Sequence, residues 1–344
     1  MMLVVLSTLL QTIPADSGEG HLRNIRQLTA GGQNAEAYFS RSGQQIIFQR
    51  QESDSGCDQQ FVMNVDGTNL HRVSSGRGRT TCGYFFANDG SIFYASTEHI
   101  GAACPPRADY SKGYVWALYD YDIYVASADG GSGGAGGAGG ARRITNNPRY
   151  DAEGTLSPDG KTIVFTSLRD GDLDIYSMSV DGRHLKRLTR TLGYDGGPFF
   201  SPDGKHIVYR AWHPQTAADS TDYRGLLAQN LVRPVRMEIW VMDADGAHPR
   251  QVTNLGGANF APYFHPDGRR IMFASNHKHP RSRNFDLYLV GADGNGLEQI
   301  TTSAEFDAFP MFSPDGRHLV WASNRHGSTP GETNIFIADW IEAP

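Results

Sequence analysis

The sequence has no surplus of positive charge and no long hydrophobic segment. Its 31 lysines and arginines stand against 37 aspartates and glutamates, giving a net charge of -6 at pH 7. A nucleic-acid partner is therefore not expected. The only long apolar run, Met1 to Leu10, is far shorter than the roughly 20 residues that cross a bilayer. Followed by polar residues, it is typical of a secretory leader, so residues 1–20 are predicted to be a leader or disordered N-terminus of an exported protein.

Cysteine is also scarce. The three cysteines, Cys57, Cys82 and Cys104, are an odd number, so at most one disulfide can form within the chain. A bridge such as Cys82 with Cys104 is feasible if the protein is exported, and three unrelated thiols are the alternative.

Motifs that carry common chemistries are missing. There is no G-x-S-x-G elbow, no H-E-x-x-H, no P-loop and no paired-cysteine metal site. The sequence therefore predicts no catalytic residue, no bound metal and no cofactor, and the leading prediction is a protein without enzymatic activity.

The sequence does contain an internal repeat. The tetrad Ser157-Pro158-Asp159-Gly160 recurs three times, and two degenerate copies come before it. Each copy lies between two short β-rich runs, which indicates a hairpin, and two further runs complete an antiparallel meander of four strands. The other copies begin at Ser40, Ala87, Ser201, His265 and Ser313. Six repeats with a spacing of 44 to 48 residues in the plain units predict a propeller.

The ends of the chain predict how the ring closes. The sixth repeat stops after its third strand, "NIFIADW", whereas Ile25 to Thr29, "IRQLT", has the sequence of a fourth strand with no unit before it. We therefore expect an all-β fold, a single six-bladed β-propeller over residues 21–344, with four-stranded antiparallel blades and the N-terminal strand closing the last blade.

The order "Ser-Pro-Asp-Gly", a β-run, "Asp-Ile-Tyr-x-Met", "Asp-Gly" and "Arg-Leu-Thr" in Ser157 to Thr189 resembles the repeat of the TolB-like propeller family. The resemblance implies a docking platform of the bacterial periplasm with a protein or peptide partner in the cell envelope. The α/β domain that precedes the propeller in TolB is not expected in this chain, so the resemblance concerns the family rather than TolB itself.

Comparison among the six repeats separates architecture from candidate sites. The tetrad aspartates and the polar residue that starts each third strand recur throughout, so they are interpreted as turn and strand-start chemistry. Two other registers are predicted to form rings at one mouth of the channel, and their members other than Thr81 and Glu52 are predicted to contact the partner. The first, at the start of the innermost strand, is Asn34, Thr81, Asp151, Asp195, Asn259 and Asp307; the second, at the end of the second strand, is Glu52, His99, Arg169, His213, His277 and Arg325.

Long insertions in the second and fourth repeats fall on the same face. They separate the second and third strands, and long loops on a rigid scaffold commonly carry binding sites. The insertion of the fourth repeat is predicted to contain a short helix with Tyr223, Leu226, Leu227 and Leu231 on one side, and the alternative to a binding role for it is a lid packed on the propeller.

Two alternatives remain open. His213, His277 and His279 could supply three imidazoles to a metal, which faintly resembles the histidine cluster of oligogalacturonate lyases and would make the protein a metal-dependent carbohydrate lyase or hydrolase. The chain could also be the accessory propeller of a peptidase complex, since propellers host many functions.

Overall fold

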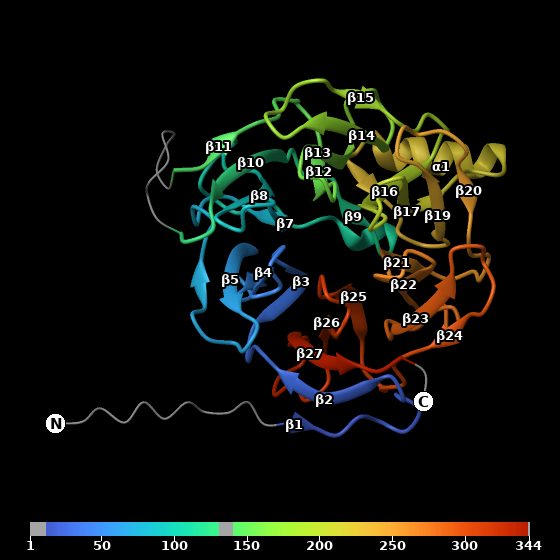
Figure 1. Ribbon diagram of the computed structural model, residues 1–344. Helices are drawn as coiled ribbons and strands as arrows, with labels where there is room; N and C mark the ends of the chain where they lie inside the picture. Colours follow the sequence, from blue (N-terminus) through green and yellow to red (C-terminus); the bar gives the residue numbers. More distant parts are fainter. Residues whose placement is uncertain (1–11, 131–139, 343–344) are drawn as a thin grey trace.

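A computed structural model describes residues 12–130 and 140–342, and it shows six antiparallel sheets arranged around a central channel (Figure 1). The predicted all-β, six-bladed propeller is confirmed. The apolar run of the predicted leader lies outside the described residues, whereas residues 12–20 contact the propeller. None of the helices in the described ranges is long and apolar enough to span a membrane.

The strands follow one another outward from the channel in each blade. Blades 1 to 3 are β3 (Gln33–Phe39), β4 (Gln45–Gln51), β5 (Gln59–Asn64) and β6 (His71–Arg72); β7 (Thr80–Phe85), β8 (Ser91–Ser96), β10 (Asp122–Ser127) and β11 (Arg142–Arg143); and β12 (Asp151–Leu156), β13 (Thr162–Ser167), β14 (Asp174–Ser179) and β15 (Lys186–Arg187). Blades 4 and 5 are β16 (Tyr194–Phe200), β17 (His206–Trp212), β19 (Glu238–Asp243) and β20 (Arg250–Gln251), then β21 (Asn259–Phe264), β22 (Arg270–Ser275), β23 (Asp286–Gly291) and β24 (Glu298–Gln299).

Blade 6 joins the two ends of the chain. It consists of β25 (Asp307–Phe312), β26 (His318–Ser323), β27 (Asn334–Trp340) and the N-terminal β2 (Leu22–Gln27), with β1 (Thr12–Ile13) added at its edge. Leu22 pairs with Trp340, and Gln27 pairs with Phe336. The predicted closure by the N-terminal strand is therefore confirmed, and it satisfies the backbone groups that an open edge would expose.

The second strands form the core because neighbouring blades cover both of their faces. In β13, five consecutive residues from Ile163 to Ser167 are buried, and β22 and β26 show the same pattern. Such strands are continuously buried rather than buried at alternate residues, because each blade is packed between two others.

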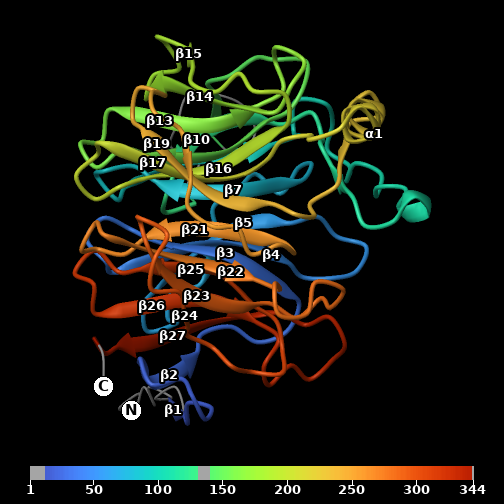
Figure 2. The same ribbon diagram turned by 90° about the vertical axis from the view of Figure 1, so that its right-hand side faces the viewer.

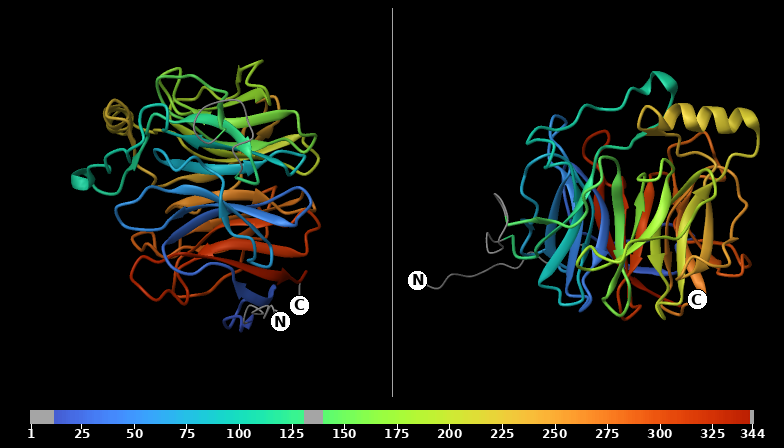
Figure 3. Two further views of the ribbon diagram at one scale, coloured as in Figure 1. Left: turned by 90° about the vertical axis from the view of Figure 1, so that its left-hand side faces the viewer. Right: turned by 90° about the horizontal axis from the view of Figure 1, so that it is seen from above.

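The two long insertions lie on one face of the ring, beyond the strand ends (Figures 2 and 3). The blade 2 insertion contains the 3-10 helix η1 (Tyr110–Lys112) and β9 (Trp116–Ala117), and the blade 4 insertion contains α1 (Ala217–Leu227) and β18 (Leu231–Val232). The strands β9 and β18 pair with each other, so the insertions form one joined cover.

The predicted lid helix is present. Its Tyr223, Leu226 and Leu227 are buried, whereas Leu231 lies beyond the helix in β18. The Tyr223 hydroxyl lies 2.6 Å from Asp172 Oδ1 and 2.8 Å from the carbonyl of Gly193. Asp172 therefore anchors the helix to blades 3 and 4.

The structure corrects the register of blade 2 by one residue. Thr80, not Thr81, pairs with Ser96 as Asp151 pairs with Ser167. At the other end of the hairpin, Asp89 has a φ of 54°, the position held by Gly160 in blade 3. The degenerate tetrad is thus Phe86 to Asp89, because Asp can take the left-handed conformation that glycine usually supplies.

Candidate functional site

The predicted acid and amide ring lies inside the blades. Asp151 is completely buried and accepts hydrogen bonds from Asn147 Nδ2, Ser167 Oγ and Arg169 Nη2 at 3.0, 2.5 and 2.7 Å. Burial raises its pKa to about 6, although the Arg169 charge acts against this. The other ring members Asn34, Asp195, Asn259 and Asp307 are 0–1% exposed and are likewise bonded within the protein.

Members of the second ring bond to the first. Arg169 pairs with Asp151, His213 Nε2 lies 3.0 Å from Asp195 Oδ1, and the buried Arg325 contacts Asp307 and Glu19. His277 instead bonds Ser275, and Glu52 lies 3.7 Å from Arg50. In blade 2, Glu98 rather than His99 has the equivalent position, because its N–H donates to Ser96 Oγ as that of Arg169 donates to Ser167 Oγ. Within residues 12–130 and 140–342, the two rings are thus joined by ion pairs in blades 3, 4 and 6, and not in blades 1, 2 and 5.

The main cavity of the described structure lies at the same end of the channel as the two rings, but other residues form its wall. It has a volume of about 1050 Å³, and none of the ten residues predicted as partner contacts lines it. The expected position of those residues around the open mouth is therefore corrected: they hold the ends of the blades together. Whether any of them contacts a partner stays a prediction.

A β-bulge in every innermost strand turns one residue toward the cavity. The strand register shifts in each first hairpin, and the bulged residue has a positive φ between 47° and 61°. A bulge re-aims side chains and is common next to binding sites. The six residues, all in the cavity wall, are Glu36, Cys82, Glu153, Gly197, Ala261 and Phe309.

The cavity contains a buried ion pair. Arg210 of β17 contacts Glu153 of β12, and Glu153 also accepts from Thr166 Oγ1 at 2.7 Å and from the N–H of Gly197 at 2.9 Å. Gly197 is required here, since an added Cβ would lie 2.2 Å from the Arg210 guanidinium and its φ is +61°. Burial is tolerated because the two charges are paired and the Glu153 oxygens accept further hydrogen bonds, whereas Arg210 Nε has no partner among the described residues.

A second carboxyl group, Glu36, lacks such partners. Its Oε2 is buried without a hydrogen bond in the described structure. Burial raises the pKa of Glu36 to about 7, opposed by a hydrogen bond to Cys82. Burial also raises the pKa of the Cys82 thiol. At neutral pH, this side of the cavity is therefore only partly charged.

Aromatic residues of the blade 2 insertion cover the cavity. Trp116 in β9 lies 5.1 Å from the Phe260 ring of blade 5, and the Arg210 guanidinium lies 5.3 Å from the Trp116 ring. Tyr110 and Tyr114 of the same insertion are 58% and 54% exposed. The cover therefore presents apolar rings both to the cavity and to solvent.

The disulfide differs from the sequence-based suggestion. Cys57 and Cys104 are bonded, with their Cα atoms 5.6 Å apart, and Cys82 is free. The suggested Cys82–Cys104 bridge is thus wrong, because the bulge turns Cys82 into the cavity while Cys57 lies in the loop next to the blade 2 insertion. The bond attaches this insertion to blade 1.

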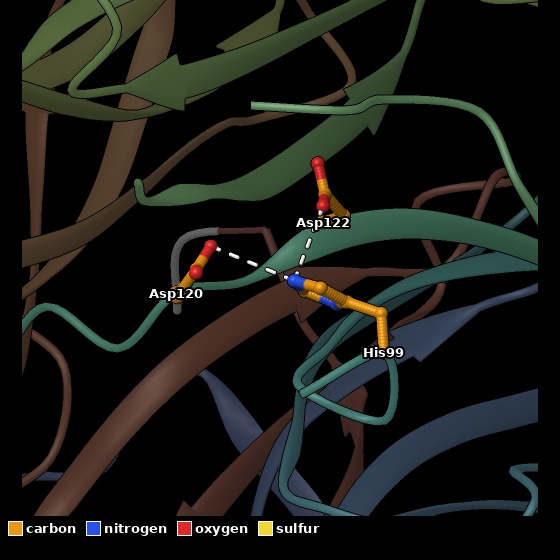
Figure 4. A group of neighbouring side chains, drawn as sticks. All are labelled: His99, Asp120 and Asp122. Carbon is orange, nitrogen blue, oxygen red and sulfur yellow. Dashed lines mark ion pairs between the residues drawn. The ribbon is translucent and has the colours of Figure 1, made fainter. Parts of the chain in front are cut away.

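The histidines considered for a metal do not form a metal-binding group. Within the described ranges, the one cluster of three donors within 4.8 Å of one another is His99, Asp120 and Asp122, and Figure 4 shows the imidazole pointing between both carboxylates. His99 Nε2 lies 3.6 Å from Asp120 and 3.5 Å from Asp122. Arg143 already contacts the same oxygen of Asp122, and its positive charge opposes a cation there. We interpret this cluster as a charge network.

Known proteins share both the repeat and the fold of this chain. The fold and the repeat define a six-bladed β-propeller with two paired insertions over one face, and a family model for the TolB β-propeller domain matches residues 120–222 and 232–338. The chain belongs to this family. Its match to the Tol-Pal system protein TolB of Bordetella pertussis is 45% identical over 60 residues, 17% of this chain and 12% of that protein. An uncharacterized protein of Agrobacterium fabrum is 30% identical over 156 residues, 44% of this chain and 42% of that protein.

Solved structures share the fold at low sequence identity. A putative TolB from Agrobacterium tumefaciens has a TM-score of 0.57 at 18% identity, covering 91% of each chain. A gluconolactonase from Xanthomonas campestris has a TM-score of 0.60 at 14% identity, covering 96% of this chain and 95% of that chain. An oligogalacturonate lyase in complex with manganese has a TM-score of 0.52 at 12% identity, covering 97% of each. These likenesses concern the fold alone.

Sequence reasoning missed the cavity wall. The residue two positions after the ring residue varies among blades, from Glu36 and Glu153 to Gly197 and Phe309. Variation at one register of an otherwise repeated innermost strand is the signal that could have identified it. Trp116 and Arg210 had no such signal, since only the folded chain brings them together.

Proposed function

We propose that this chain is a non-enzymatic, exported propeller that binds a protein or peptide partner over the cavity and its two insertions. The observation that carries the proposal is the cavity of about 1050 Å³ under a cover of exposed tyrosines, with arginines around it. Tyrosine, tryptophan and arginine are the residues enriched at the energetically important centres of protein interfaces.

Family membership supports an envelope setting and a partner protein, because the name of the TolB relative places it in the Tol-Pal system. We assign a supporting part to the two rings. Their residues are Asn34, Asp151, Asp195, Asn259 and Asp307 in the first ring, and His99, Arg169, His213, His277 and Arg325 in the second. They hold the strand ends and loops from which the cavity and its cover are built.

Photo-crosslinking in cells tests this proposal. A photoreactive phenylalanine analogue at Tyr110 or Tyr114 should give a discrete adduct with a partner, and replacing Asp151, Asp195 and Asp307 by Ala should reduce that adduct. The matched controls are Leu185 and Leu297, which are 46% and 41% exposed at hairpin tips on the opposite face. Adducts from the control positions alone would contradict the proposal.

A further inference from the structure

The cavity wall carries a charge opposite to that of the whole protein. It contains six arginines, namely Arg79, Arg107, Arg210, Arg236, Arg281 and Arg283, and three carboxyl residues, Glu36, Asp58 and Glu153, although the chain has a net charge of -6. Among the described side chains of the wall there is no lysine or histidine. This surplus is concentrated where the two insertions and blade 5 meet.

Two of the arginines are neutralised inside the cavity. Arg79 contacts Asp58, and Arg210 contacts Glu153. Both pairs are largely buried and leave no charge for a ligand. The third carboxyl residue, Glu36, lies deep in the wall, where burial favours its uncharged form.

The remaining four arginines are exposed around the entrance. Arg236 lies 3.6 Å from Asp219, whereas Arg107, Arg281 and Arg283 have no carboxylate partner among the described residues. Arg283 stacks over the Tyr114 ring at 5.9 Å, and Arg107 is held by the carbonyl of Asp54. These contacts orient two guanidinium groups and leave their charges unneutralised.

We infer that the partner enters this entrance with an acidic polypeptide segment, a deduction that rests on the proposed function. Guanidinium groups pair with carboxylates through two parallel hydrogen bonds, and such pairing is favoured next to apolar surface. The exposed Tyr110 and Tyr114 beside these arginines provide the apolar contact that a protein segment uses. An acidic sugar chain shares the charge and is the competing occupant.

The test uses three synthetic peptides with one glycine, serine and tyrosine framework, carrying four Glu, four Gln or four Lys residues. Binding to the full chain is measured by fluorescence anisotropy at two salt concentrations. We expect the Glu peptide to bind at least tenfold more tightly than the Gln peptide, the Lys peptide to bind most weakly, and the preference to shrink as salt rises. An oligosaccharide of uronic acids is the fourth probe.

Two variants with equal charge change locate the effect. R281E/R283E should weaken Glu-peptide binding at least tenfold, whereas R183E/R317E, at exposed hairpin tips on the opposite face, should leave it unchanged. Equal binding of all three peptides, preference for the uronic acid chain, or no binding of the Glu peptide would each overturn the inference. Crosslinking at Tyr110 and Tyr114 reports on the proposed function independently, since it makes no assumption about charge.

Discussion

Two glutamates at one register of the repeat, Glu36 and Glu153, have different hydrogen-bonding environments. Glu36 and Glu153 have the same bulge position in the channel strands of blades 1 and 3, yet Glu153 is bonded by Arg210, Thr166 and Gly197 while Glu36 retains a buried, unbonded oxygen. An unpaired carboxyl group in such a place costs folding free energy when it is charged. The two carboxyl groups therefore have different environments, although they share one register of the repeat.

This difference predicts a pH-dependent effect of E36Q. The pKa of Glu36 rises from 4.5 to about 7 on folding, so its contribution to stability is fully present below pH 4.5 and is lost as the pH rises to 7. E36Q removes this titration. We expect the variant to be more stable than the native protein at pH 8, by at most about 3 kcal/mol, with a much smaller difference at pH 5.

Urea unfolding of both proteins at the two pH values measures this difference. E52Q is the control, because the Glu52 side chain is 65% exposed and its substitution should change stability equally at both pH values. A stability difference for E36Q that is the same at pH 5 and pH 8 would show that Glu36 ionises normally in the folded protein.

At the scale of the elements, the two insertions behave as one structural unit. Pairing of β9 with β18 joins them, Tyr223 attaches α1 to Asp172, and the Cys57–Cys104 disulfide attaches the blade 2 insertion to blade 1. Two attachments to the blades and one pairing between the insertions therefore hold the cover over the cavity. A pre-organised cover reduces the entropy lost when a partner binds.

Removal of the disulfide should loosen the cover and leave the blades intact. In C57S/C104S we expect faster amide hydrogen exchange over residues 97–115, unchanged exchange in β13 and β22, and a decrease of a few degrees in Tm, because a crosslink restricts the chain mainly around its attachment points. Hydrogen exchange read by mass spectrometry measures this, and C82S is the matched control. A non-reduced peptide map that links Cys82 to either partner would refute the assigned bridge.

The whole molecule is closed by a strand from the opposite end of the chain. Leu22 and Ile25 of β2 are completely buried against blade 6, and β2 pairs along β27. Burial of two such side chains contributes roughly 3–6 kcal/mol. Ring closure thus makes the stability of all six blades depend on a short N-terminal segment.

A chain lacking residues 1–27 should accordingly unfold at a lower urea concentration, with its free energy of unfolding reduced by at least about 3 kcal/mol. A chain lacking only residues 1–11 keeps β1 and β2 and should retain this free energy. A permuted chain in which residues 12–28 follow residue 342 through a flexible linker should recover the lost stability, since the same pairs can form. Equal stability of the two truncated chains would refute closure by β2.

Sequence alone determined the blade plan, because a repeated pattern of turn residues and β-rich runs is a local property. Asp159 and Asp203 close their own turns, and the partial sixth repeat identified the closing strand before any tertiary contact was considered. The same reasoning placed the insertions on one face and predicted the lid helix. It also identified the two rings, which ion pairs join in blades 3, 4 and 6.

Only the tertiary structure decided which side chains face the cavity. A bulge changes the direction of a side chain within a strand, and the one-residue register shift in blade 2 replaced His99 by Glu98. The meeting of Trp116 with Arg210 and the choice of Cys57 as the partner of Cys104 depend on how loops from different blades pack. Repeated residues encode the blade, whereas the site is formed by nonrepeated residues that come together through long-range packing.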